Sequence, residues 1–227
     1  MSMQFGYVSP EQAMKDRADF ARKNVARGRP LVALQYDDGI LICAENPSRT
    51  LHKVSEIYDR IAFAGVGKYS EFDGLRTMGV RHADIKGFQY SREDVDARSL
   101  ANAYAQYLGQ VFTHELKPLE VEILVAEVGY EAADDQLFHI LYDGTVVDER
   151  GFSVLGGDVD AIADRLRESF REGVTRNDGL KAAVAALAGA DRTLTATELE
   201  AAVLARTNGR RAFQRLDPQD LETALAA

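Results

Sequence analysis

The chain has 227 residues, a formal net charge of −9 and one cysteine. That length fits one large α/β domain or at most two small ones. A hydrophobic content of 46% allows a substantial core and excludes a disordered chain. An acidic chain repels phosphate, so we expect no general nucleic-acid binding. The lone cysteine fits a reducing, cytoplasmic compartment, and neither a secretory signal nor a membrane span is expected.

The first helix is predicted from its two ends. Residues 1–8 have no period long enough to indicate a helix or a strand. Ser9 can cap a helix and Pro10 suits the first helical position, so a helix begins here. Gly28 and Pro30 end it after about 18 residues.

Two Asp-Gly pairs predict β-hairpins. Asp38-Gly39 lies between two apolar runs, residues 31–36 and 40–44. Asp143-Gly144 likewise separates residues 137–142 from residues 145–148. Asp-Gly between strand-like runs is a strong hairpin signal. Other apolar runs predict strands at residues 61–66, 121–129, 152–155 and 211–216. Residues 199–204 stay ambiguous, because their Ala and Leu content favours a helix.

The remaining segments favour helices that occur in pairs. Further helices are expected at residues 68–89, from Ser91 to about 116 with Ser91 as its cap, at 158–172 and 175–188, and from Asp217 onward. Gly79 interrupts the helical pattern of the first of these. Hairpins and helix pairs differ from regular βαβ alternation, which gives a parallel sheet. Two antiparallel sheets packed face to face, with helix pairs outside, fit this order better.

No local pattern predicts a catalytic, metal or nucleotide site. No two histidines have metal-ligand spacing; they are His52, His82, His114 and His139. Cys43 lies in a predicted buried strand, which favours a core thiol over a nucleophile. The run from Gly65 to Tyr69 lacks the first glycine and the final hydroxyl residue of a phosphate loop. Its glycines are better explained by close packing where a strand meets a helix.

Basic residues gather in and just after the first predicted helix. They are Arg17, Arg22, Lys23, Arg27 and Arg29. Such a cluster fits a solvated face with salt bridges, and it equally fits a rim that binds a partner's carboxylates.

Four ordered segments resemble the proteasome subunit family. The strand pair LVALQYDDGILICAENPSR and the following LHKVSEIYDRIAFAGVG resemble the start of a proteasome subunit. The preceding SPEQAMKDRADFARKNVARG looks like the additional helix of α-type subunits. Together with GKYSEFDGLR, these segments are similar to α subunits of actinobacterial 20S proteasomes. The resemblance extends from Tyr7 to about Leu216.

The resemblance implies an α+β fold, namely the four-layer αββα sandwich of N-terminal-nucleophile hydrolases with an extra N-terminal helix. It divides the chain into a gate segment, residues 1–8, and one α-type domain, residues 9–227. The gate segment, which closes an axial pore, comprises Met1, Ser2, Met3, Gln4, Phe5, Gly6, Tyr7 and Val8.

The resemblance also implies a structural and gating role without catalysis. Proteasome α subunits form heptameric rings that stack on rings of the catalytic β subunits. In β subunits a threonine freed by propeptide removal opens the first strand and acts as nucleophile. Arg29 stands near that position here and carries no nucleophilic atom. A catalytic hydrolase is therefore disfavoured, while an orphan scaffold of the same fold without a protease partner remains the alternative.

The resemblance places an activator-docking pocket around Lys53, which would pair with the carboxylate of an activator's C-terminal tail. The other pocket positions are Arg22, Gly28, Gly65 and Val66. The expected partners are further copies of this chain, β subunits, a ring-shaped ATPase or an ATP-independent activator, and unfolded protein substrates in transit. No cofactor, metal, nucleic acid or membrane is expected.

Overall fold

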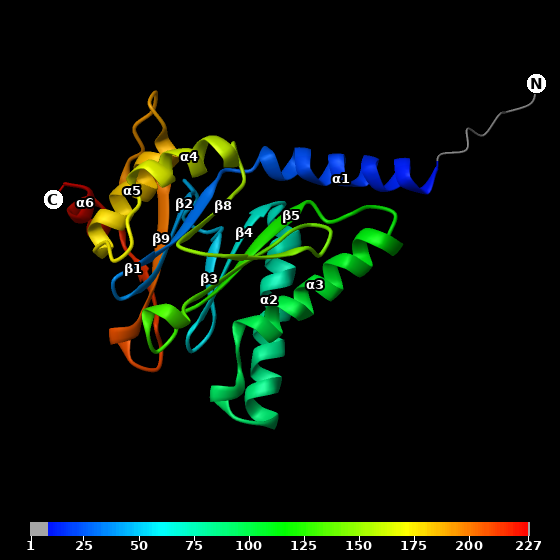
Figure 1. Cartoon of the computed structure of the whole chain (residues 1–227), viewed down its shortest axis with the longest axis horizontal. Helices are drawn as coiled ribbons and strands as arrows, with labels where there is room; N and C mark the ends of the chain where they lie inside the picture. The colour runs from blue at the N-terminus through cyan, green and yellow to red at the C-terminus, as the bar shows by residue number, and fades with distance from the viewer. Residues whose placement is uncertain (1–8, 227) are drawn as a thin grey trace, which may run out of the picture.

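Two antiparallel sheets form the centre of the molecule (Figure 1). The computed structural model describes residues 9–226, so the predicted gate segment lies outside the described residues. Sheet A has the order β10-β9-β2-β1-β8, and sheet B has the order β3-β4-β5-β6-β7. The strands are β1 (Leu31–Tyr36), β2 (Gly39–Glu45), β3 (Val54–Tyr58), β4 (Ile61–Gly67), β5 (Val121–Glu127), β6 (Gln136–Ile140), β7 (Val146–Glu149), β8 (Phe152–Leu155), β9 (Leu199–Ala205) and β10 (Phe213–Leu216).

Helices cover the outer face of each sheet. The helices of the described residues are α1 (Pro10–Ala26), α2 (Tyr69–Gln89), α3 (Ala97–His114), α4 (Val159–Ser169), α5 (Arg176–Ala188) and α6 (Pro218–Ala226), and all of them except α1 lie on these outer faces. One buried cluster joins α2 and α3 to sheet B, and another joins α4, α5 and α6 to sheet A. A third fills the space between the two sheets. This arrangement confirms the four-layer αββα sandwich.

Helix α1 stands apart from the four layers. Ser9 caps it by accepting a hydrogen bond of 3.2 Å from the backbone N–H of Gln12, as the sequence predicts. Only Ala21 and Val25, near the C-terminal end, are buried. That end contacts β4 and β5, and the rest of the helix projects from the end of the sheets (Figure 1).

Both predicted hairpins form. β1 pairs with β2 up to Tyr36 and Gly39. In the β6–β7 hairpin the backbone N–H of Leu141 donates to the carbonyl oxygen of Thr145 over 2.9 Å. The β7–β8 connection then carries the chain from one edge of sheet B to one edge of sheet A, so this corner joins the two sheets.

One sequence-based prediction is wrong, one segment that was left open is now assigned, and one strand was missed. The continuous helix from Ser91 is wrong, because Ser91 caps only a short 3₁₀ turn, Arg92–Asp94. Val95 is extended, and Asp96 caps α3 by accepting from Ser99 N over 2.7 Å. The ambiguous run around residues 199–204 is the strand β9, which is buried along its whole length. Strand β3 was not predicted at all.

The glycines at the end of β4 serve packing, as the sequence analysis favoured. A Cβ atom on Gly65 would lie 2.7 Å from the ring of Phe72 in α2. Gly67 has φ of +108°, and a Cβ atom there would lie 2.0 Å from the carbonyl oxygen of Glu120. Side chains are therefore excluded at both positions by neighbouring atoms. Cys43 is fully buried and burial raises its pKa to about 12, so the core-thiol interpretation is confirmed.

The glycine inside α2 leads to a test of the helix packing. A Cβ atom on Gly79 would lie 1.9 Å from the hydroxyl oxygen of Tyr104, a buried group that donates to Leu75 O over 3.0 Å. Gly79→Ala should therefore lower the free energy of unfolding by about 1–3 kcal/mol, measured by chemical denaturation.

Gly74 in the same helix supplies the control, because a Cβ atom there meets nothing within 4 Å. Gly74→Ala should be neutral or stabilise the protein by up to about 1 kcal/mol. Equal effects of the two substitutions would contradict the packing explanation.

Candidate functional site

A buried carboxylate holds the segment that carries Lys53. Glu200 lies in β9 and is only 7% exposed. It accepts hydrogen bonds from the backbone N–H of Lys53 over 2.8 Å and of Val54 over 3.3 Å. The side chain of Asn46, at the end of β2, donates to the same carboxylate over 2.7 Å. Both ends of the β2–β3 connection are thus fixed to one group in β9.

Arg215 completes this network from β10. Its guanidinium forms an ion pair with Glu200 and also donates to the carbonyl oxygen of Val54 over 2.7 Å. A buried carboxylate is stable only when paired and hydrogen-bonded, and Glu200 meets both conditions. The sequence analysis did not identify these residues. The one local signal was an acidic residue inside an apolar run.

The Lys53 ammonium group points to the end of α1. It is half-buried and donates a hydrogen bond to the backbone carbonyl oxygen of Arg29. Burial lowers the pKa of Lys53 to about 8, the negative charge of Glu200 partly opposes this shift, and the positive charge of Arg29 adds to it. A lysine in this position is a cation that lacks full hydration, so an approaching carboxylate would be a favourable partner.

The glycines and the valine assigned to the pocket lie beside Lys53. Gly65 N donates to Lys53 O over 3.0 Å. A Cβ atom on Gly28 would lie 2.7 Å from Cγ1 of Val66, which is fully buried. These residues therefore shape the backbone around Lys53, and Val66 supplies a wall rather than a side chain that contacts a ligand.

Arg22 lies further along α1 and is mostly exposed. Its guanidinium donates to the hydroxyl oxygen of Tyr142 over 3.2 Å. It lines a groove of about 520 Å³ together with Val25, Glu122 and the glycine pair after β8. Lys53 does not line this groove. The structure thus brings four of the five predicted pocket residues together and connects Arg22 to them through α1.

The start of β1 carries no group suited to nucleophilic catalysis. Arg29 and Pro30 directly precede Leu31, the first residue of the strand. The Arg29 side chain is 56% exposed and its Nε atom lies 3.4 Å from a carboxylate oxygen of Glu45. Within residues 9–226, no group of three or more His, Cys, Asp or Glu residues could hold a metal ion. In the same part of the chain, no helix is long and apolar enough to cross a membrane.

Comparisons with known proteins agree with this fold. The sequence model of the family described as "Proteasome subunit" matches residues 25–204. "Proteasome subunit alpha" of Acidimicrobium ferrooxidans is 62% identical over 225 residues, covering 99% of this chain and 97% of that protein. The α subunit of Sanguibacter keddieii is 57% identical, covering 100% and 91%. That of Thermomonospora curvata is 56% identical, covering 100% and 99%.

The chain therefore belongs to the proteasome subunit family. Its relatives along the full length carry the name of the α subunit and come from actinobacteria, so within the family it has the role of an α-ring subunit of the 20S core. The resemblance stated from the sequence is confirmed, and so is the fold class.

The electrostatic environment of the Lys53 side chain can be measured directly. Acylation of its amine requires the neutral form, so the acylation rate should rise with pH through a midpoint near 8. Glu200→Gln should move this midpoint to lower pH, because the carboxylate favours the ammonium form. Arg29→Gln should move it to higher pH, because a like charge is removed. Mass spectrometry of the peptide that contains Lys53, sampled over a range of pH, gives the midpoint for the unaltered protein and for each variant.

Lys181 on α5 serves as the internal control, since it lies in the helix layer over sheet A. Neither substitution should change the extent of Lys181 acylation. A Lys53 midpoint that stays near 10.4, the value of an unperturbed lysine, would contradict the burial of this side chain.

Proposed function

We propose that this chain assembles into heptameric α rings that close the ends of a 20S core and open when an activator inserts a C-terminal tail beside Lys53. The observation that carries the proposal is the contact of the Lys53 ammonium group with Arg29 O, three residues beyond the end of α1. The tail site is thereby connected to the helix that follows residues 1–8, the proposed gate.

The proposed partners follow from the family. Further copies of this chain complete the ring, and β subunits supply the peptidase sites below it. Unfolded polypeptides are the substrates in transit, and the activator is a ring-shaped ATPase or an ATP-independent ring. Cytoplasmic location fits the single buried thiol, Cys43. These assignments rest on the family and on the charge of the pocket.

The chain is proposed to have no catalytic activity of its own. An N-terminal nucleophile needs a hydroxyl or thiol next to a free amine at the start of the first strand. Here α1 leads without a break into Arg29, Pro30 and then β1. Peptide hydrolysis by the assembled particle is therefore assigned to the β subunits.

Opening follows from competition for one ammonium group. A tail carboxylate beside Lys53 forms a charge-assisted hydrogen bond, which is stronger than the bond to the neutral Arg29 carbonyl. Arg29 O then loses its donor, and the segment after α1 loses one of its attachments to the β2–β3 connection. A tail can shift the gate only to the extent that it binds the open ring more tightly than the closed one. The exchange of partners at Lys53 supplies this difference in affinity between the open and the closed ring.

The proposal is tested with particles reconstituted from this chain and a β subunit. Lys53→Ala should reduce the stimulation of peptide hydrolysis by an activator tail peptide about tenfold or more, because a charge-assisted pair is lost. Lys181→Ala removes the same charge from α5 and should leave stimulation unchanged. Hydrolysis of a small fluorogenic peptide gives the rates.

Deletion of residues 2–8 distinguishes an effect on the proposed gate from an effect on the proposed pocket. This deletion should raise basal hydrolysis to the same level with Lys53 and with Lys53→Ala, because no gate remains to be opened. Normal stimulation of Lys53→Ala particles would contradict the assigned pocket. An unchanged basal rate after the deletion would contradict the assigned gate.

A further inference from the structure

The amine of Lys53 differs in its contacts from other lysines of this chain. Lys68, Lys86 and Lys117 each form an ion pair with a carboxylate. A carboxylate beside an ammonium group favours the protonated form, which cannot act as a nucleophile. Within residues 9–226, Lys53 Nζ has no carboxylate at ion-pair distance and donates instead to the neutral carbonyl oxygen of Arg29. Its amine therefore lacks the contact that keeps those three lysines protonated.

Basic side chains surround Lys53 at the surface, and the carboxylates between them are buried. Four basic side chains contact these carboxylates; they are Arg29, His52, Arg192 and Arg215. The side chains of the two carboxylates, Glu45 and Glu200, are 12% and 6% exposed, whereas the four basic side chains are 35–56% exposed. Hydrogen bonds from Thr195 lower the pKa of the nearby Glu198 carboxyl group, and the charges of Arg192 and Arg29 lower it further. This surface therefore stabilises an anion.

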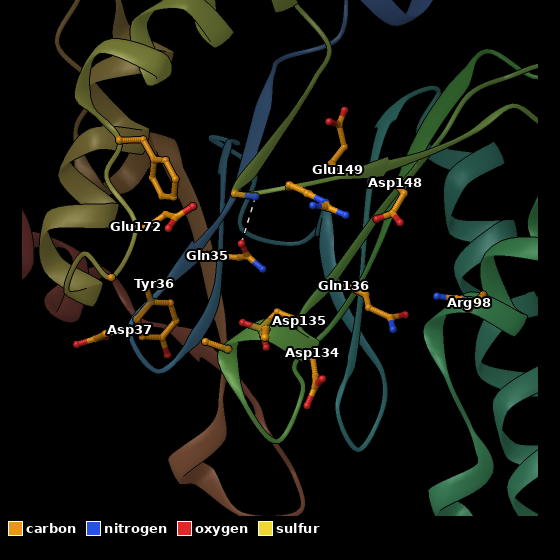
Figure 2. A pocket seen from close by; sticks show the side chains of 16 residues that line it. Gln35, Tyr36, Asp37, Arg98, Asp134, Asp135, Gln136, Asp148, Glu149 and Glu172 are labelled. Atoms are coloured by element: carbon orange, nitrogen blue, oxygen red, sulfur yellow. Dashed lines mark hydrogen bonds between the residues drawn. The ribbon is translucent and has the colours of Figure 1, made fainter.

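The surface around Lys53 contrasts with the cavity at the corner between the two sheets (Figure 2). That cavity is lined by more carboxylates than guanidinium groups, among them Asp134, Asp148 and Glu172. The chain as a whole carries a formal charge of −9. A small anion is therefore repelled by the chain as a whole and by this cavity, and it is attracted to the surface around Lys53.

The Lys53 amine is also suited to react with such an anion. Burial lowers the pKa of Lys53 to about 8, so near neutral pH a larger share of this amine is neutral than of an ordinary lysine. Only the neutral amine has the free electron pair that attacks a carbonyl carbon. The side chain is half-buried, and its hydrogen bond to Arg29 O lies at the exposed surface. A small reagent can therefore reach the nitrogen from solvent while one N–H stays on Arg29 O.

We propose that Lys53 is a site of regulatory acylation by acyl phosphates, small anions that carry an activated carbonyl group. The electron pair of Nζ attacks the carbonyl carbon and forms a C–N bond. The bond from that carbon to the phosphate oxygen breaks, phosphate leaves with the electron pair, and the proton of the amine passes to water.

The product of this reaction is a neutral amide. It retains one N–H that donates to Arg29 O, but it has no charge for the carboxylate of an activator tail. The acylated subunit therefore keeps the contact at Arg29 and no longer responds to a tail. This consequence rests on the proposed function of the Lys53 pocket, whereas the modification itself does not.

Acetyl phosphate is the probe, incubated near neutral pH with particles reconstituted from this chain and a β subunit. Peptide mass spectrometry gives the rate of acetylation at each lysine. Lys53 should react about tenfold faster than Lys15 and Lys23, which are exposed on α1, because more of its amine is neutral. Equal rates at the three lysines would overturn the proposed modification site and would leave the proposed tail pocket untouched.

The role of the basic surface is tested by changing the charge of the reagent. Arg192→Gln should slow acetylation of Lys53 by acetyl phosphate about threefold, because one attractive charge is lost. It should not slow acetylation by the uncharged N-hydroxysuccinimide ester of acetic acid. The matched control is Arg167→Gln on α4, an exposed position that makes the same charge change and should alter neither rate. Equal slowing by both variants would show that only net charge matters and would overturn the role of this surface.

The regulatory consequence is measured on the same treated particles. Stimulation of peptide hydrolysis by an activator tail peptide should fall in proportion to the fraction of Lys53 that is acetylated. Treated particles that lack residues 2–8 should keep their basal hydrolysis, which excludes damage to the β subunits. Full stimulation after complete acetylation of Lys53 would overturn the regulatory role. If Lys53→Ala particles were also stimulated normally, the proposed tail pocket would fail as well, so the two failures are distinguishable.

Discussion

The buried carboxylate of Glu200 is the interaction on which the proposed pocket depends. It fixes the backbone of Lys53, the side chain of Asn46 and the guanidinium of Arg215. Strands β2, β9 and β10 and the start of β3 therefore meet at one charged group. Removing one partner of a buried ion pair is costly, so this network keeps the Lys53 segment in a single arrangement. The Lys53 ammonium group can then lie at Arg29 O, beside the end of α1.

Much of the fold could be predicted from local signals. Ser9-Pro10 gave the start of α1, and the two Asp-Gly pairs gave both hairpins, because these signals act within a few residues. Strand β9 was not recognised, because its Ala and Leu content favours a helix locally while its pairing with β2 and β10 decides the outcome. Likewise, Val95 separates the Ser91 turn from α3 through packing that involves distant residues.

The candidate site was predictable only in part. Lys53 and its neighbours were assigned by family resemblance, and the structure places Lys53, Gly28, Gly65 and Val66 together. Glu200 and Arg215 could not be assigned, because they lie about 150 residues from Lys53 in the sequence and act through long-range pairing.

The central claim, a gating ring without catalysis, is tested most directly by native mass spectrometry combined with a peptidase assay. The chain is measured alone and after mixing with a β subunit from one of the actinobacteria named above. The account predicts that the chain alone forms rings that do not hydrolyse peptide, and that hydrolysis begins when β joins them. Peptide turnover by the chain alone would contradict the claim, as would a monomer that never joins β, which is the behaviour of an orphan scaffold.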